Sequence, residues 1–332
     1  AIRACERGGA WGNALELVGE LRRGGLRPDS ALYASAASAC TRGGEWQLAL
    51  ALLAEARQGG VEQTLGLCTV GVSACEEGSA WQQALALLAE MYVLRLPANV
   101  LSLSAGCSAC ARAGEWQASL ALLEQLLREG LEPSHIAYNA ALSACERGRQ
   151  WERAFDLLAE MRRLELEPNV RTHNALISAC EKGREWERAL EVFAGVPSEG
   201  LEASSVTFHA AISACDKGGE WRRAVGLLCG LERQRLRPDQ ITFYAALSAL
   251  EGGRAWRGAL DLFSSMWPQC LRPDLVCYLS TARALGLGTG WRACVGALES
   301  VREEEDAGAG LLLSATAFAH EASSAPAPFA LA

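Results

Sequence analysis

The sequence predicts an all-α solenoid of stacked antiparallel helix hairpins, and two regularly repeated residues carry that prediction. Tryptophan recurs every 35 residues, at Trp11, Trp46, Trp81, Trp116, Trp151, Trp186, Trp221, Trp256 and Trp291. Cysteine recurs six positions upstream, at Cys5, Cys40, Cys75, Cys110, Cys145, Cys180 and Cys215. A fixed period of this size is typical of repeats that bury their apolar faces only by stacking on neighbours.

The period divides the chain into three regions. Residues 1–29 form the tail of a truncated repeat, since Cys5 and Trp11 are late positions of it, and we expect the natural start to lie upstream. Residues 30–309 hold eight tandem repeats, which begin at Ser30, Leu65, Val100, His135, Val170, Ser205, Gln240 and Leu275. In residues 310–332, Leu311–Glu321 is expected to form a capping helix over the end of the stack, followed by a flexible tail.

Each repeat contains two helical patterns. In the second pattern, apolar residues stand at spacings of three and four and form one stripe, as at Trp151, Ala154, Phe155, Leu158 and Met161. Gly148, Gly183 and Gly218 stand between the two helices, where a helix end favours a left-handed residue. The second helix is followed by a segment such as Gly25–Asp29, in which the proline disfavours helix before it and the last residue is a good N-cap for the next repeat.

Composition excludes several classes of protein. The net charge of -8 does not favour nucleic-acid binding, and no apolar run is long enough to cross a membrane. One cysteine per stacked layer suits neither a disulfide nor a metal site, so the cysteines are expected to be small buried residues of a protein in a reducing compartment. Cys107 and Cys110 form a CxxC inside a predicted helix, without a second pair. No cofactor or metal site is expected.

The period, the Pro-Asn or Pro-Asp junctions and three short segments resemble the pentatricopeptide repeat family. The segments are Ala137–Leu142 (AYNAAL), Thr172–Ile177 (THNALI) and Val206–Phe208 (VTF). The resemblance covers most of the chain. It implies a right-handed α-solenoid superhelix that binds single-stranded RNA in organelles, with about one base per repeat.

In that family the fifth and last residues of a repeat read the base edge. Carried over to this sequence, the pairs are Thr69 with Asn99, Ser104 with Ser134, Asn139 with Asn169, Asn174 with Ser204, His209 with Asp239, and Tyr244 with Asp274. The first of these resembles an adenine reader, and the two pairs that begin with asparagine resemble pyrimidine readers. His209 and Tyr244 depart from the residues usual at the fifth position, as do Ala34 and Leu279.

The resemblance also implies roles for two further rows of residues. The second residue of a repeat packs against base faces, which assigns Leu101, Ile136, Arg171, Val206, Ile241 and Val276 to that role. A basic row near the end of the first helices is similar to the family's phosphate-contacting lysine, and comprises Arg42, Arg112, Arg147, Lys182 and Lys217.

Each assignment has a purely structural alternative. The last residue of a repeat is also the N-cap of the next helix, and the basic row also suits a helix C-terminus. Tryptophan at the start of the second helix is expected to pack between repeats rather than to stack on bases. Acidic residues such as Glu76, Glu146, Glu181 and Asp216 precede the basic row and lie nearly on the stripe of the fifth residues. The binding surface is therefore expected to be close to neutral, with weak and salt-sensitive RNA binding.

No catalytic constellation is visible, because the four histidines are scattered and form no known motif. Together with this absence, the resemblance implies a non-enzymatic, monomeric protein that binds single-stranded RNA and acts in RNA processing, stability or translation in a plastid or mitochondrion. Two alternatives stay open. One is a protein-interaction scaffold that uses the concave solenoid surface, and the other is the binding array of a larger RNA-processing enzyme.

Overall fold

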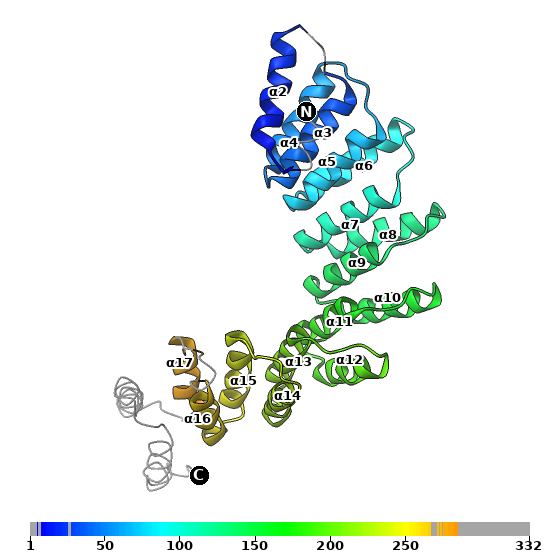
Figure 1. The fold of residues 1–332 in the computed structure, drawn as a ribbon. Coiled ribbons are helices and arrows are strands. Elements are labelled where there is room, and N and C mark those ends of the chain that lie inside the picture. The colour runs from blue at the N-terminus through cyan, green and yellow to red at the C-terminus, as the bar shows by residue number, and fades with distance from the viewer. Residues whose placement is uncertain are drawn as a thin grey trace, which may run out of the picture. The chain divides into compact units, whose positions relative to one another are not determined.

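The computed structural model describes Cys5, residues 8–25, residues 28–266, Leu271, Pro273 and residues 275–284 (Figure 1). Every regular element among them is an α-helix, as the period predicts. Asp274, the second helix of the eighth repeat and the expected capping helix lie outside the described residues. None of the helices in the described part of the chain is both long enough and apolar enough to span a bilayer.

The helices alternate between two kinds that begin at fixed points of the repeat. The first helix begins at the first residue of each repeat: α3 (Ser30–Arg42), α5 (Leu65–Glu77), α7 (Val100–Ala113), α9 (His135–Arg147), α11 (Val170–Gly183), α13 (Ser205–Gly218), α15 (Gln240–Gly252) and α17 (Leu275–Ala284). The second helix begins at the periodic tryptophan: α2 (Trp11–Arg23), α4 (Trp46–Gln58), α6 (Trp81–Val93), α8 (Trp116–Arg128), α10 (Trp151–Arg163), α12 (Trp186–Ser198), α14 (Trp221–Arg233) and α16 (Trp256–Ser265). The predicted helix hairpins are confirmed.

The first helices are capped by the last residue of the preceding repeat. The Asp29 carboxylate accepts a hydrogen bond from the Leu32 amide at 2.8 Å, and the Ser134 hydroxyl accepts one from the Ala137 amide at 3.3 Å. Thr64, Asn99, Asn169, Ser204 and Asp239 cap the next helix in the same way. These bonds satisfy an amide that the first turn of a helix leaves without a partner, so the structural role expected for these residues is confirmed.

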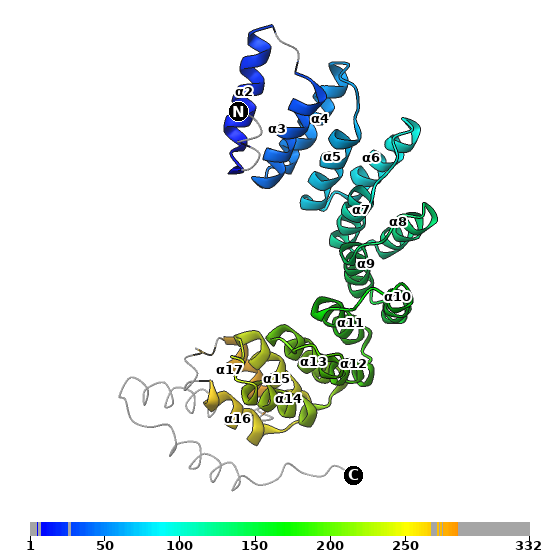
Figure 2. The same cartoon turned by 45° about the vertical axis from the view of Figure 1, so that its right-hand side comes forward.

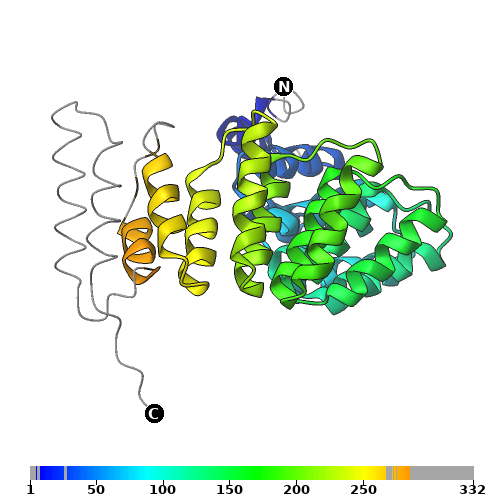
Figure 3. The same cartoon turned by 90° about the horizontal axis from the view of Figure 1, so that it is seen from below.

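Contacts divide the chain into two compact units, Ala1–Ala179 and Cys180–Ala332. In the N-terminal unit α3, α5, α7 and α9 follow one another in contact, and each also packs on the second helix of its own repeat (Figure 2). In the C-terminal unit α13, α15 and α17 also follow one another in contact, and α13 and α15 each pack on the second helix of their own repeat. Figure 3 shows the helices of this unit in colours that pass from green to orange. Both units therefore consist of stacked hairpins.

Small buried residues allow the first helices to approach one another. Ala36, Ala37, Ala39 and Cys40 in α3 are completely buried. The repeated cysteines from Cys40 to Cys215 are all buried free thiols, as expected, and Cys5 is half-buried. Alanine and cysteine carry little side-chain volume, so the helix backbones come close without leaving cavities.

The periodic tryptophan packs on a glycine of the next repeat. A Cβ added at Gly148 would lie 2.4 Å from Cδ1 of Trp116, and one added at Gly218 would lie 2.4 Å from Cδ1 of Trp186. Gly43, Gly78 and Gly253 meet Trp11, Trp46 and Trp221 in the same way. The tryptophans therefore pack between repeats, as expected.

The prediction that Gly148, Gly183 and Gly218 adopt a left-handed conformation at the helix end is wrong. Gly148 has a φ of -77°, and the left-handed residue is the following Arg149, with a φ of 56°. Gly183 and Gly218 are likewise absent from the residues of positive φ, where Arg184 and Gly219 stand instead. At Gly148 and Gly218, glycine is needed because the indole leaves no room for a side chain.

Candidate nucleic-acid interface

Large apolar side chains project into solvent from the second position of several first helices. Exposed fractions are 61% for Leu101, 64% for Ile136, 58% for Val206, 60% for Ile241 and 42% for Val276. Arg171 occupies the same position of α11 and is also exposed. Single exposed apolar residues are common, but the same position exposed helix after helix indicates a contact surface.

The fifth and last residues of a repeat meet at the N-terminus of the next first helix. The hydroxyl oxygens of Ser104 and Ser134 are 3.5 Å apart. Asn139 and Asn169 are joined through the next repeat, because Oγ1 of Thr172 lies 2.9 Å from Oδ1 of Asn139 and 3.2 Å from Oδ1 of Asn169. In these two repeats, residues thirty positions apart in the sequence thus form one polar cluster.

His209 and Asp239 form an ionisable version of the same cluster. Burial works to raise the pKa of Asp239, but hydrogen bonds from Thr242 and the nearby His209 outweigh it, so the pKa lies below its usual value. Nδ1 of His209 is buried and has no hydrogen-bond partner among the described residues. This repeat thus places a histidine ring and a carboxylate at the positions that carry hydroxyls or amides in the other two clusters.

Exposure differs among the fifth residues. Thr69 and Ser104 are only 7% and 4% exposed, and the Thr69 hydroxyl donates to the carbonyl of Leu65 in its own helix at 2.8 Å. Asn139, Asn174 and His209 are half-buried, and Tyr244 is exposed. The asparagine and histidine repeats therefore offer more polar surface to a ligand than the repeats of Thr69 and Ser104.

Two residues of the basic row pair with carboxylates of the preceding repeat, and a third binds a backbone carbonyl. Nη1 of Arg112 lies 3.3 Å from Oε2 of Glu77, and Nζ of Lys217 lies 2.5 Å from Oε1 of Glu181. Arg147 donates to the carbonyl of Arg112 at 2.6 Å. Arg42 is exposed at the end of α3, and Lys182 is half-buried near the end of α11. These ion pairs give the predicted near-neutral surface a structural basis.

A serine at the ninth position of the repeat, which was not predicted as a site residue, contacts the acidic residues that precede the basic row. The Ser213 hydroxyl donates to Oε1 of Glu181 at 2.7 Å. Burial raises the pKa of Glu76, while Arg112 and a hydrogen bond from Ser108 work to lower it. Burial also raises the pKa of Asp216, against a hydrogen bond from Ser248 and the charge of Lys217. The signal in the sequence was the recurring Ser-Ala-Cys triplet.

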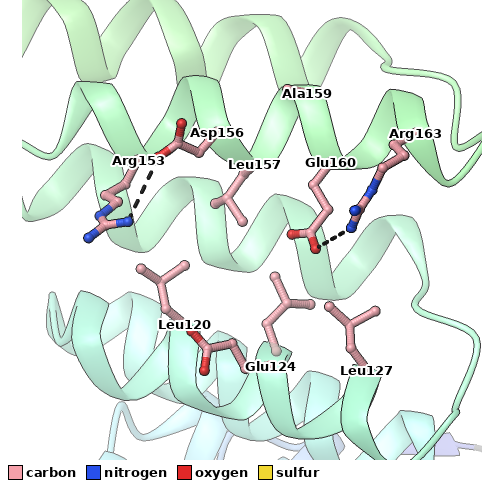
Figure 4. Close-up of a pocket in the computed structure, with 10 residues that line it drawn as sticks. Leu120, Glu124, Leu127, Arg153, Asp156, Leu157, Ala159, Glu160 and Arg163 are labelled. Atoms are coloured by element: carbon pink, nitrogen blue, oxygen red, sulfur yellow. Dashed lines mark hydrogen bonds and ion pairs between the residues drawn. The ribbon is translucent and has the colours of Figure 1, made fainter.

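A second surface lies between two second helices of the N-terminal unit. A groove of about 400 Å³ separates α8 from α10, with Leu120, Leu127 and Leu157 among its apolar lining (Figure 4). Arg153 pairs with Asp156 at 3.8 Å, and Arg163 pairs with Glu160 at 3.4 Å along the α10 side. The groove is built from the layer that does not carry the fifth residues.

The described residues show no metal centre, and the two thiols of the CxxC segment are not activated. No group of three or more His, Cys, Asp or Glu side chains in this part of the chain is placed to hold a metal ion. Burial raises the pKa of Cys107 to about 12 and that of Cys110 to about 11, which keeps both thiols protonated at neutral pH.

Comparison with known proteins identifies the repeats. A family model described as the PPR repeat family matches residues 133–182, and one described as PPR repeat matches residues 171–201. Residues 133–201 therefore consist of pentatricopeptide repeats. No curated protein sequence matches the chain.

Solved structures of this family share the fold. The pentatricopeptide repeat protein PPR10 from maize superposes with a TM-score of 0.66 at 25% identity, over 91% of this chain and 43% of PPR10. A triple cysteine-to-serine variant of PPR10 in complex with an 18-nt psaJ RNA element superposes with a TM-score of 0.75 at 18% identity, over 91% of this chain and 44% of PPR10. The chain thus spans less than half the length of PPR10.

Proposed function

We propose that this protein binds single-stranded RNA and reads about one base per repeat. The observation that carries the proposal is the polar cluster of fifth and last residues, which recurs beside an exposed apolar second residue. A ligand that fits must offer a polar edge and a flat apolar face at each step, and an unpaired nucleic-acid base offers both. The PPR10 structure with bound RNA supports the proposal by its fold.

Helix capping and base reading are compatible at the last residue. The cap on α11 uses Oδ1 of Asn169, which accepts the Thr172 amide at 3.1 Å. The Nδ2 group of the same side chain carries two further donors. In α13 the Ser204 oxygen accepts the Thr207 amide at 3.3 Å and lies 3.0 Å from Oγ1 of Thr207, so its own proton can go to Thr207 or to a ligand. The two roles are therefore not alternatives for these residues.

The ion pairs of the basic row limit the affinity for RNA. Arg112 and Lys217 reach a phosphate only by giving up Glu77 and Glu181, so each phosphate contact exchanges one ion pair for another. Binding is expected to be weak and to fall with salt. In this proposal the protein is a non-enzymatic monomer that acts on organellar RNA, in processing, stability or translation, within a plastid or mitochondrion.

A second candidate function is a protein scaffold, and the groove between α8 and α10 favours it. The groove combines leucines with charged residues of both signs, which suits a helical or extended peptide better than RNA. The third possibility, an array within a larger RNA-processing enzyme, is consistent with the chain matching less than half of PPR10.

Selection from pools of single-stranded RNA at two salt concentrations tests the proposal. We expect an adenine at the Thr69–Asn99 repeat and two adjacent pyrimidines at the Asn139–Asn169 and Asn174–Ser204 repeats, separated from the adenine by one position. Absence of RNA binding at low salt would favour the scaffold.

A substitution designed from the chain itself sharpens the test. Asn139→Thr beside the unchanged Asn169 reproduces the Thr69–Asn99 pair, so the preference at that one position is expected to change from pyrimidine to adenine. Circular dichroism checks that the helices remain folded. An unchanged preference in a folded variant contradicts base reading by the fifth residue.

A further inference from the structure

We propose that Thr172 is a positioning residue that fixes which edge of the Asn139 amide faces the RNA. Thr172 belongs to the following repeat, at its third position, and no direct contact with RNA is required of it. The inference rests on the proposed function, because it specifies how one of the base-reading side chains is oriented.

The Thr172 hydroxyl is completely buried between the two asparagines. Its oxygen accepts the backbone amide of Asn169 at 3.2 Å. Its single proton has two acceptors within reach, Oδ1 of Asn139 at 2.9 Å and Oδ1 of Asn169 at 3.2 Å. Because Oδ1 of Asn169 already accepts the Thr172 amide, the nearer Oδ1 of Asn139 is the better acceptor for the hydroxyl.

The bond between the Thr172 hydroxyl and Oδ1 of Asn139 determines which atom of the Asn139 amide faces a ligand. A free asparagine side chain can rotate and exchange its oxygen for its nitrogen at little cost, since both form hydrogen bonds with water. With Oδ1 held by a buried hydroxyl, the Nδ2 group of Asn139 is left as the edge available to a ligand. Asn139 then acts as a donor, and it favours bases that present an acceptor, such as the carbonyl oxygens of uracil and cytosine.

The residue at the third position of a repeat can be compared with the fifth residue of the preceding repeat. Asn139 is followed by Thr172, and Asn174 by Thr207, whereas Ala34 is followed by Leu67 and Ser104 by Ala137. A third-position hydroxyl also serves the cap, as Thr172 does by accepting the Asn169 amide at 3.2 Å and Thr242 does by donating to Oδ1 of Asp239 at 2.5 Å. The bond from Thr172 to Oδ1 of Asn139 at 2.9 Å is additional to the cap. A buried threonine follows each fifth-position asparagine.

Two variants and one control separate positioning from capping. Thr172→Val keeps the shape of the side chain and removes the hydroxyl, whereas Thr172→Ser retains it. Loss of one hydrogen bond is worth about fivefold to tenfold. Thr172→Val is therefore expected to reduce the preference for a pyrimidine over a purine at the Asn139 position by that factor, and Thr172→Ser to restore it. Thr242→Val removes a capping hydroxyl elsewhere and is expected to leave the preference at the Asn139 position unchanged.

A measurement on the unaltered chain avoids any loss of folding. Sulfur is a poorer acceptor than oxygen, so replacing the uridine at the Asn139 position by 2-thiouridine or 4-thiouridine is expected to weaken binding several-fold for one of the two. Equal binding of both analogues and uridine, or full discrimination by Thr172→Val, overturns the inference while leaving RNA binding intact. If the unaltered chain binds no RNA, the proposed function fails as well, and the two failures are distinguishable.

Discussion

The first and second helices of the repeats solve the same packing problem in different ways. First helices are capped by side chains and pack closely through alanine and cysteine, as in α3 with its cap Asp29. Second helices with a described N-terminus begin at tryptophan without a side-chain cap, as in α8, and neighbouring second helices leave grooves such as those between α8 and α10 and between α4 and α6. The first layer therefore fixes polar side chains precisely, whereas the second layer carries the tryptophans that hold one repeat on the next.

The largest effect is expected where the two layers meet. Gly148→Ala places a methyl group against the Trp116 ring, and because φ is -77° the cost comes from that contact alone. Overpacking of this kind destabilises by about 1–3 kcal/mol. Gly226→Ala is the matched control, since its Cβ meets nothing within 4 Å in the exposed face of α14, and it is expected to stabilise slightly. Urea denaturation of both variants measures the difference, and equal stabilities would remove the assigned role of the tryptophan.

The second-largest effect is expected on RNA affinity, which should depend on first helices and not on second helices. Ile136→Ser removes an exposed apolar side chain of a first helix, and Val93→Ser does so at the end of a second helix, where the side chain is 81% exposed. We expect RNA binding to weaken about fivefold in the first variant, in line with ~1 kcal/mol of lost apolar contact, and not at all in the second. Fluorescence anisotropy measures both. Equal effects would show that exposed apolar side chains act without regard to layer.

A smaller effect is expected in the salt dependence. Glu181→Gln releases Lys217 for a phosphate, so the slope of log affinity against log salt is expected to steepen by about 0.7 for a single strand. Glu191→Gln makes the same change on a second helix, where Glu191 pairs with Arg188 at 3.5 Å, and should leave the slope unchanged. A slope that does not respond to Glu181→Gln would exclude Lys217 from the phosphate contacts.

The smallest effect is expected in the pH dependence of the free energy of unfolding. Burial raises the pKa of Asp216, which faces Ser248, Lys217, Glu251 and Glu181. The folded state then binds protons more readily than the unfolded state, so this group's contribution to the free energy of unfolding falls as pH rises from about 4 through the raised value. Asp216→Asn is expected to flatten that part of the profile, which urea midpoints at several pH values will show. An unaltered profile would mean that the carboxyl titrates alike in both states.

The periodic features of the fold could be predicted from the sequence because each depends on neighbours along the chain. The helices begin at the predicted tryptophans and after the predicted caps, since Pro-Asp and Pro-Asn junctions act locally. The contact between Trp116 and Gly148 and the bond between Thr172 and Asn139 could not be predicted. The latter joins residues 33 positions apart, and only the stacking of one repeat on the next brings them together. Among the candidate site residues, the burial of Thr69 and Ser104 has the same origin.

Crosslinking of a photoreactive base tests the central claim most directly. The base is placed at successive positions of a bound RNA, and the crosslinked residues are identified by mass spectrometry. We expect the crosslinks to fall on first helices, beside residues such as Ile136 and Asn139, and to advance by 35 residues for each nucleotide, the interval of the tryptophans. Crosslinks on second helices, or at sites that do not advance with the nucleotide, would contradict the account.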